Sequence, residues 1–188
     1  MVSINEKVPD LVLDSVVGCE REKITLSSYR GKYLLVFFYP LNFTFTSPSD
    51  IYQEDQGFNV QTDAHCQVIG VSTEHVQCLA RYQQTFLPWN SKDIRLVSDP
   101  FCRIIKTFGL SEEVSNMAFR ALALIDPKGR LLSIEKSYSQ DGFDMEAVLG
   151  KLTELREKCP ECGGLMLEEV IRGDKTRQYC GDCQLLRI

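Results

Sequence analysis

The chain has 188 residues, of which 44% are hydrophobic and 25% are charged, so it can bury one main core and carry a small appendage. Its 21 basic residues against 26 acidic ones give a net charge of -5, which provides no general attraction to phosphate backbones or anionic membranes. The first residues lack the basic and apolar regions of a secretion signal, and no stretch reaches the roughly 18 apolar residues of a membrane span. We therefore expect a soluble, cytoplasmic protein that binds neither nucleic acid nor membranes.

Strand-like and helical patterns alternate along the chain. The unbroken apolar run 33–39, which Pro40 ends, predicts a strand buried on both faces of a sheet. Ser47 and the proline after it are typical of a helix start, because serine caps helices well and proline fits the first helical position. We expect this helix to cover about 47–63 and the run 67–72 to form a second strand.

The same alternation continues in the second half of the chain. A segment with apolar residues at helical spacing follows Glu74, and residues 94–97 are strand-like. Asp99 and the proline after it should open another helix, for which Gly109 is the expected C-terminal stop.

The main domain should end with a hairpin and a helix. Residues 118–126 and 130–136, joined by an Asp-Pro-Lys-Gly turn, predict a β-hairpin. A helix at about 144–157 has an apolar face that should dock on the sheet. Together these elements indicate an α/β architecture of thioredoxin type, a mixed sheet covered by helices, over residues 1–157.

Residues 158–188 form a second unit that is rich in cysteine, glycine and charge. Four cysteines follow the spacing C-x2-C-x17-C-x2-C, namely Cys159, Cys162, Cys180 and Cys183. Two residues between thiolates let each pair bind one metal ion in a tight turn, and a segment of about 30 residues is too short to bury a core. The pattern predicts a zinc ribbon whose folding free energy comes from metal ligation.

Other states of these cysteines remain open. They could form disulfides or stay free, although the cytosol keeps ordinary thiols reduced, and four sulfur ligands could hold iron in place of zinc. Between Cys159 and Ile188 the ribbon has four basic and five acidic residues, so we expect it to make a protein contact or give structural support.

The segment that follows the first predicted strand resembles the signature of the peroxiredoxins, in which Pro, Thr and Cys occur as P-x3-T-x2-C before a proline. Pro40 and Thr44 match this signature, and Ser47 stands where the family has its peroxide-reducing cysteine. Arg120 matches the second arginine of the family. The resemblance covers about residues 5–157 and is to the alkyl hydroperoxide reductase and thiol-specific antioxidant type. It implies a thiol-dependent peroxidase on a thioredoxin-like fold, acting on hydrogen peroxide or organic hydroperoxides.

The resemblance also implies that the reactive residue lies in the first turn of a helix, beside Thr44 and Arg120. A helix N-terminus and a guanidinium both favour negative charge, so they would lower the pKa of a thiol and hold it as a nucleophilic thiolate. The hydroxyl of Ser47 stays protonated near neutral pH and lacks the reversible oxidation of sulfur. We therefore expect Ser47 to cap the helix and the chain to have little or no turnover. Both a laboratory substitution and a natural loss of the cysteine fit the sequence.

Recycling and partners follow from the same resemblance. Most family members need a second, resolving thiol, and Cys159 lies near its position, but one cysteine cannot readily both bind metal and resolve, so we favour the metal role. The implied partners are a hydroperoxide, a thiol reductant such as thioredoxin, and further copies of the chain in homodimers or rings of dimers. A non-enzymatic binding or assembly module that uses the ribbon for contacts is the alternative. A weaker possibility is a ribbon that holds iron and donates electrons.

Overall fold

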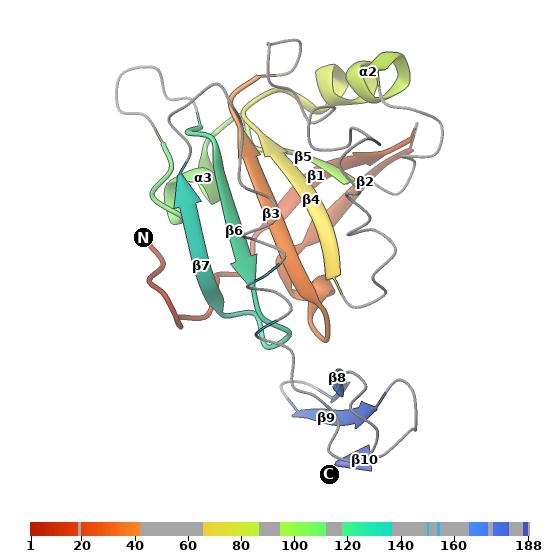
Figure 1. The fold of residues 1–188 in the computed structure, drawn as a ribbon. Helices are drawn as coiled ribbons and strands as arrows, with labels where there is room; N and C mark the ends of the chain where they lie inside the picture. The colour runs from red at the N-terminus through yellow and green to blue at the C-terminus, as the bar shows by residue number, and fades with distance from the viewer. Residues whose placement is uncertain are drawn as a thin grey trace.

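The computed structural model contains two separate β-sheets (Figure 1). It describes residues 1–18, 20–41, 66–86, 95–111, 118–136, 150, 154, 166–172, 175–180 and 186–187. One sheet has seven strands and the other has three.

The seven-stranded sheet has the order β2-β1-β5-β4-β3-β6-β7. Its strands are β1 (Val12–Val17), β2 (Glu20–Thr25), β3 (Tyr33–Tyr39), β4 (Cys66–Ser72), β5 (Arg95–Ser98), β6 (Ala121–Ile125) and β7 (Leu131–Lys136). Strand β4 is parallel to both β3 and β5, and the other neighbouring pairs are antiparallel. The sheet is therefore mixed, as the sequence predicts.

Strand β3 is an interior strand whose two faces are both buried. Alternate residues from Leu34 to Phe38 belong to the largest core cluster, on one face of the sheet. The residues between them, together with Tyr39, belong to a second cluster with side chains of β4 and β6. Because side chains alternate along a strand, an unbroken apolar run suits this position, and the prediction from 33–39 is confirmed.

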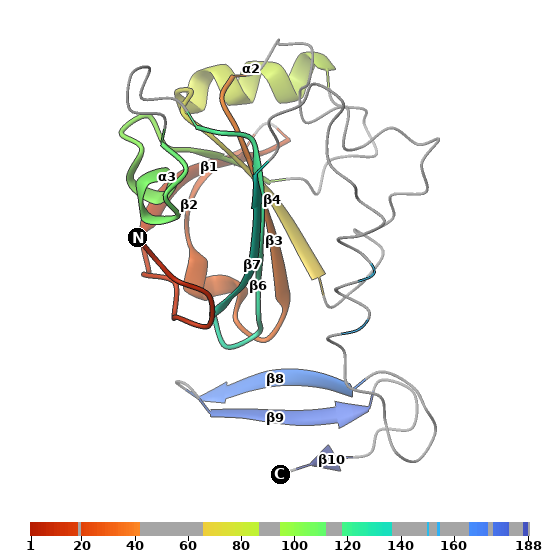
Figure 2. The ribbon, with the colours of Figure 1, turned by 60° about the vertical axis from the view of Figure 1, so that its left-hand side comes forward.

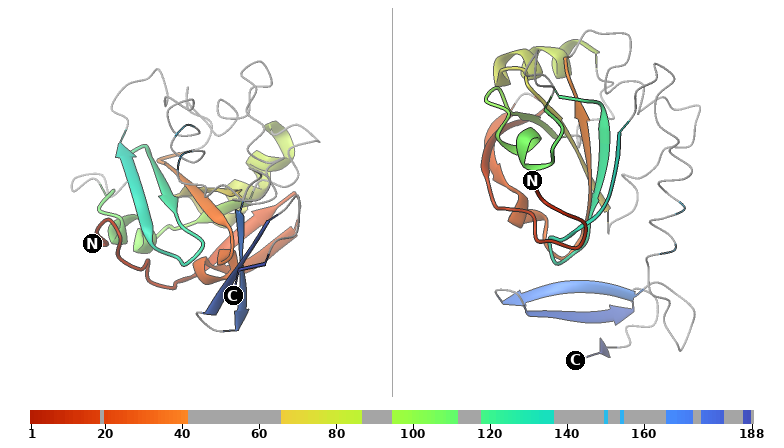
Figure 3. Two further views of the ribbon diagram at one scale, coloured as in Figure 1. Left: turned by 60° about the horizontal axis from the view of Figure 1, so that its bottom comes forward. Right: turned by 90° about the vertical axis from the view of Figure 1, so that its left-hand side faces the viewer.

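Helices cover parts of this sheet. Helix α2 (Val76–Phe86) packs on β1 and β5 through the buried side chains of Leu79 and Tyr82. Helix α3 (Arg103–Thr107) contributes Ile104 and Ile105 to the largest core cluster. Figures 2 and 3 show α3 and the N-terminal segment on the same side of the sheet. The short 3-10 helix η1 (Leu26–Tyr29) connects β2 to β3.

Helix α3 begins later than the sequence predicts. Cys102 has a φ of 53°, which lies in the left-handed region, so the helix cannot extend back to Asp99. Asp99 nevertheless acts on the helix from outside, because its carboxylate accepts hydrogen bonds from the first-turn amides. The expected stop is confirmed, since Gly109 follows the helix with a φ of 67°.

The predicted hairpin is confirmed as β6 and β7, whereas the N-terminal hairpin of β1 and β2 was not anticipated. The helix predicted at 47–63 lies outside the described residues. Of the helix predicted at 144–157, the structure describes Gly150 and Glu154, and both are helical. No helix in the described ranges has the length and hydrophobicity needed to cross a membrane.

The C-terminal segment forms the three-stranded sheet. Its strands are β8 (Met166–Arg172), β9 (Lys175–Cys180) and β10 (Leu186–Arg187), in the antiparallel order β10-β9-β8. Figure 2 shows the β8–β9 hairpin beyond one end of the seven-stranded sheet.

Candidate active site

Pro40 and Arg120 come to the same edge of the seven-stranded sheet from neighbouring strands. Strands β3 and β6 are antiparallel, and their pairing ends at Phe38 and Ala121. Pro40 follows β3 directly and Arg120 directly precedes β6, so both lie beyond that pair. Both residues are half-buried. The sheet thus brings two of the four residues predicted for the peroxide site to one edge.

The carbonyl oxygen of Pro40 accepts two hydrogen bonds from hydroxyl groups at the end of β4. Ser72 Oγ donates at 3.1 Å and Thr73 Oγ1 donates at 2.9 Å. The parallel pairing of β3 with β4 ends at Tyr39 and Ser72, so residues 72 and 73 lie beside Pro40. Side-chain hydroxyls therefore hold this carbonyl group where the strand ladder stops.

Nearby backbone groups hold Ser72 itself in place. Its hydroxyl is fully buried and accepts a hydrogen bond from the backbone amide of Glu74 at 3.2 Å. Its backbone carbonyl accepts one from the amide of Asp99 at 2.7 Å. The hydroxyl of Ser98 donates to the carbonyl of Glu74 at 2.7 Å. The ends of β3, β4 and β5 are thus joined by one hydrogen-bonded network.

Asp99 extends this network to α3. Its side chain is almost fully buried, and its two carboxylate oxygens accept hydrogen bonds from the amides of Arg103 at 2.7 Å and Ile105 at 3.0 Å. Burial raises the pKa of Asp99 above its ordinary value, although these amides oppose the shift. The sequence predicts Asp99 at the start of this helix, but it does not predict the hydrogen bonds from Ser72 and Thr73 to Pro40, because these depend on which strands are neighbours.

The other two predicted residues, Thr44 and Ser47, lie outside the described residues. The chain has four cysteines outside the C-terminal motif. Cys66 and Cys102 are buried, as small apolar residues often are, Cys78 is exposed, and Cys19 lies outside the described residues. Burial raises the pKa of the Cys102 thiol, and the nearby charge of Asp99 adds to this effect.

One of the four predicted metal ligands is described. Cys180 is fully buried at the end of β9, where it pairs with Met166 at the start of β8. Cys159, Cys162 and Cys183 lie outside the described residues, within which no group of three potential metal ligands occurs. The strand register places Met166, which lies four positions after Cys162 in the sequence, beside Cys180 at the end of β9.

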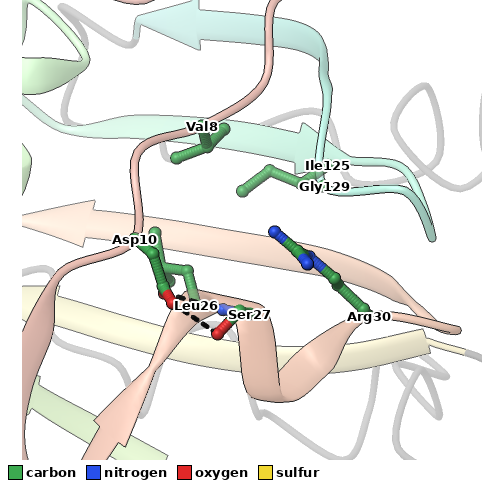
Figure 4. A pocket seen from close by; sticks show the side chains of 7 residues that line it. All are labelled: Val8, Asp10, Leu26, Ser27, Arg30, Ile125 and Gly129. Carbon is green, nitrogen blue, oxygen red and sulfur yellow. Dashed lines mark hydrogen bonds between the residues drawn. The ribbon is translucent and has the colours of Figure 1, made fainter. Parts of the chain in front are cut away.

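A small hollow lies between the N-terminal segment, η1 and the turn after β6 (Figure 4). Asp10 accepts hydrogen bonds there from the amide and the hydroxyl of Ser27. The hollow is lined by Val8, Asp10, Leu26, Ser27, Arg30, Ile125 and Gly129. It contains none of the residues predicted for catalysis.

A comparison with family models decides the membership of the chain. The model of the AhpC/TSA family matches residues 4–134, a range that includes Pro40, Thr44, Ser47 and Arg120 but excludes residues 158–188. The chain belongs to the AhpC/TSA family. Members of this family are peroxiredoxins, which are oxidoreductases of the thiol peroxidase class.

Individual relatives agree with this membership. The chain is 31% identical over 159 residues to "Peroxiredoxin 2" of Drosophila melanogaster, covering 79% of this chain and 78% of that protein. It is 31% identical over 176 residues to "Thioredoxin peroxidase" of Fasciola hepatica, covering 85% and 87%. The crystal structure of AhpC from Enterococcus faecalis matches with a TM-score of 0.73 at 24% identity, over 85% of this chain and all of that one. The last likeness supports the thioredoxin-like peroxiredoxin fold.

Proposed function

We propose that this AhpC/TSA chain is a peroxidase scaffold whose reaction centre lies at residue 47, framed by Pro40, Thr44 and Arg120. The observation that supports the proposal most is that β3 and β6 bring Pro40 and Arg120 to one edge of the sheet. The signature places residue 47 seven positions after Pro40. A guanidinium near this edge would favour negative charge on a reacting group.

With a cysteine at position 47, the chemistry would be peroxide reduction. The thiolate attacks one peroxide oxygen, so that an S–O bond forms and the O–O bond breaks. The sulfur is oxidised to a sulfenic acid, and the leaving oxygen takes a proton to become water or an alcohol. A dithiol then reduces the sulfenic acid to the thiol and becomes a disulfide, with release of water. The name of the Fasciola hepatica relative supports thioredoxin as such a reductant.

The serine of this chain should prevent that reaction. A hydroxyl ionises far above neutral pH, and oxygen has no equivalent of the reversible sulfenic acid step. We therefore propose that the chain as it stands turns over little or no peroxide, and that Ser47 caps the helix predicted to start there.

The test is to restore the thiol in a background without the exposed thiol of Cys78. Ser47→Cys with Cys78→Ser should consume hydrogen peroxide in the presence of excess dithiol, and Cys78→Ser alone should not. Adding Arg120→Leu should slow the reaction by about 100-fold, the usual cost of removing one donor to a developing charge. A folded Ser47→Cys protein that consumed no peroxide would contradict the proposal and favour a non-enzymatic binding or assembly module.

We also propose that residues 158–188 bind one zinc ion through Cys159, Cys162, Cys180 and Cys183. The burial of Cys180 and the β8–β9 register support this, because they fit two C-x2-C pairs at one end of a hairpin. The metal would supply folding free energy to a segment with little core of its own. Elemental analysis of the purified chain should find one zinc per chain, and Cys180→Ser should lose it. Stoichiometric iron with visible absorption, or four cysteines paired as disulfides, would contradict the zinc assignment.

We further propose self-association into dimers or rings of dimers, on the grounds of family membership. Analytical ultracentrifugation of the full chain checks this, because a monomer at micromolar concentration would contradict it.

A further inference from the structure

The chain leaves β3 through a carbonyl group that two hydroxyls hold in place. Pro40 O accepts from Ser72 Oγ and Thr73 Oγ1, residues that lie 32 and 33 positions further along the chain. Two donors on one carbonyl fix both its position and its direction better than a single hydrogen bond does. The signature residues Thr44 and Ser47 follow within seven positions of this point.

The donor Ser72 lies on a buried and well-connected part of the chain. The Ser72 hydroxyl is fully buried, and the strand that carries it is paired on both sides, with β3 and β5. The hydroxyl of Ser72 accepts a hydrogen bond from the amide of Glu74, and the backbone carbonyl of Ser72 accepts one from the amide of Asp99. A movement of Pro40 would therefore break its bonds to a rigid support.

We infer that Ser72 and Thr73 are positioning residues for the reactive centre, because their hydroxyls fix the point from which the chain proceeds to residue 47. The inference rests on the proposed function, since it assigns to these hydroxyls the placement of Pro40, one of the residues proposed to frame the reaction centre at residue 47. We assign neither residue a contact with the reacting atoms. Their effect passes through the Pro40 backbone.

Thr73 gives the sharper test, because its hydroxyl makes one described hydrogen bond, whereas that of Ser72 makes two. Valine has nearly the shape of threonine and removes only the hydroxyl, and serine keeps it. Both changes are made in the background of Ser47→Cys with Cys78→Ser. Thr85→Val is the matched control, because it also removes a hydroxyl that donates to a backbone carbonyl, that of Arg81 at 2.8 Å on α2.

The readout is alkylation of the thiol introduced at position 47 by iodoacetamide as a function of pH, followed by mass spectrometry on the peptide that contains this position. Thr73→Val should raise the pH midpoint and slow alkylation at pH 7 by about tenfold, since small displacements of reacting groups cost one to two orders of magnitude. Thr73→Ser and Thr85→Val should keep the midpoint and rate of the background protein. If the valine variant fails to fold, Thr73→Ala replaces it, with the same expected result.

Two results would overturn the inference. One is an unchanged midpoint and rate in Thr73→Val, and the other is an equal change in Thr73→Ser, which would indicate packing of the methyl group. The alkylation profile does not depend on peroxide. If the background protein consumed no peroxide, the proposed function would fail, while the comparison of Thr73→Val with Thr73→Ser would still decide whether the hydroxyl positions the thiol introduced at residue 47.

Discussion

Replacing Asp99 with alanine should weaken the connection between α3 and the ends of the parallel strands. Asp99 is 2% exposed, and its carboxylate accepts hydrogen bonds from the amides of Arg103 and Ile105. Ile105 is fully buried, so its amide would have no solvent to replace the lost acceptor. Arg103 is exposed, and water can reach its amide more easily.

The magnitude follows from these two amides. A buried donor left without a partner costs about 1–3 kcal/mol, and the loss of a helix-capping acceptor costs about 1 kcal/mol. Burial removes the carboxylate from water and so raises its pKa, and the relief of this desolvation in the alanine variant offsets part of that loss. We expect Asp99→Ala to lower the free energy of unfolding by about 1–3 kcal/mol, or to lower the Tm by about 3–10 °C.

The assay is urea denaturation at pH 7, followed by circular dichroism, with Asp10→Ala as the matched control. Asp10 also accepts two hydrogen bonds, both from Ser27, but it is exposed. Its replacement should cost no more than about 1 kcal/mol, because water replaces the carboxylate. Equal losses in the two variants would refute the argument from burial.

Two further predictions concern pH and core packing. Burial raises the pKa of Asp99 above its ordinary value of 3.8. The folded state therefore binds this proton more tightly than the unfolded state. The resulting contribution to stability is fully present below pH 3.8 and is lost as the pH rises through the folded-state pKa. The free energy of unfolding of Asp99→Asn should therefore fall less steeply with rising pH over this window, and a slope equal to that of the parent would contradict the assignment. Phe38 is fully buried with its ring centroid 5.1 Å from that of Phe108, so Phe38→Ala should cost about 3–5 kcal/mol in urea denaturation and Phe38→Leu clearly less. Equal costs would indicate that the site does not depend on side-chain volume.

Elements with strong local patterns could be predicted from the sequence. The apolar run of β3 needed no information beyond its own residues, because both of its faces are buried. Strand β2 carries charged, exposed residues over most of its length at an edge of the sheet, so it has no apolar alternation to reveal it. The sequence places the start of α3 too early, because aspartate is a common helix cap. Asp99 does accept hydrogen bonds from the first-turn amides, but it lies four residues before Arg103, where the helix begins.

The candidate site could be predicted only where a motif exists. Pro40 and Arg120 were found through the resemblance of the flanking sequence to a known signature, and the register of β3 with β6 gives a physical reason for their shared edge. The bonds from Ser72 and Thr73 to Pro40 connect residues more than 30 positions apart. Such bonds depend on which strands are neighbours and in what register, and no local pattern carries that information.

The proposed peroxidase function requires an environment at residue 47 that favours negative charge, and the pKa of a thiol placed there measures this directly. In Ser47→Cys with Cys78→Ser, the pH dependence of thiolate absorbance, with Cys78→Ser subtracted, gives the pKa of the thiol introduced at position 47. We predict a value at least one unit below the ordinary value of about 8.5 for a free cysteine. A value at or above that of free cysteine would contradict the proposed function, because Arg120 and the helix predicted to start at residue 47 would then give the thiolate no stabilisation.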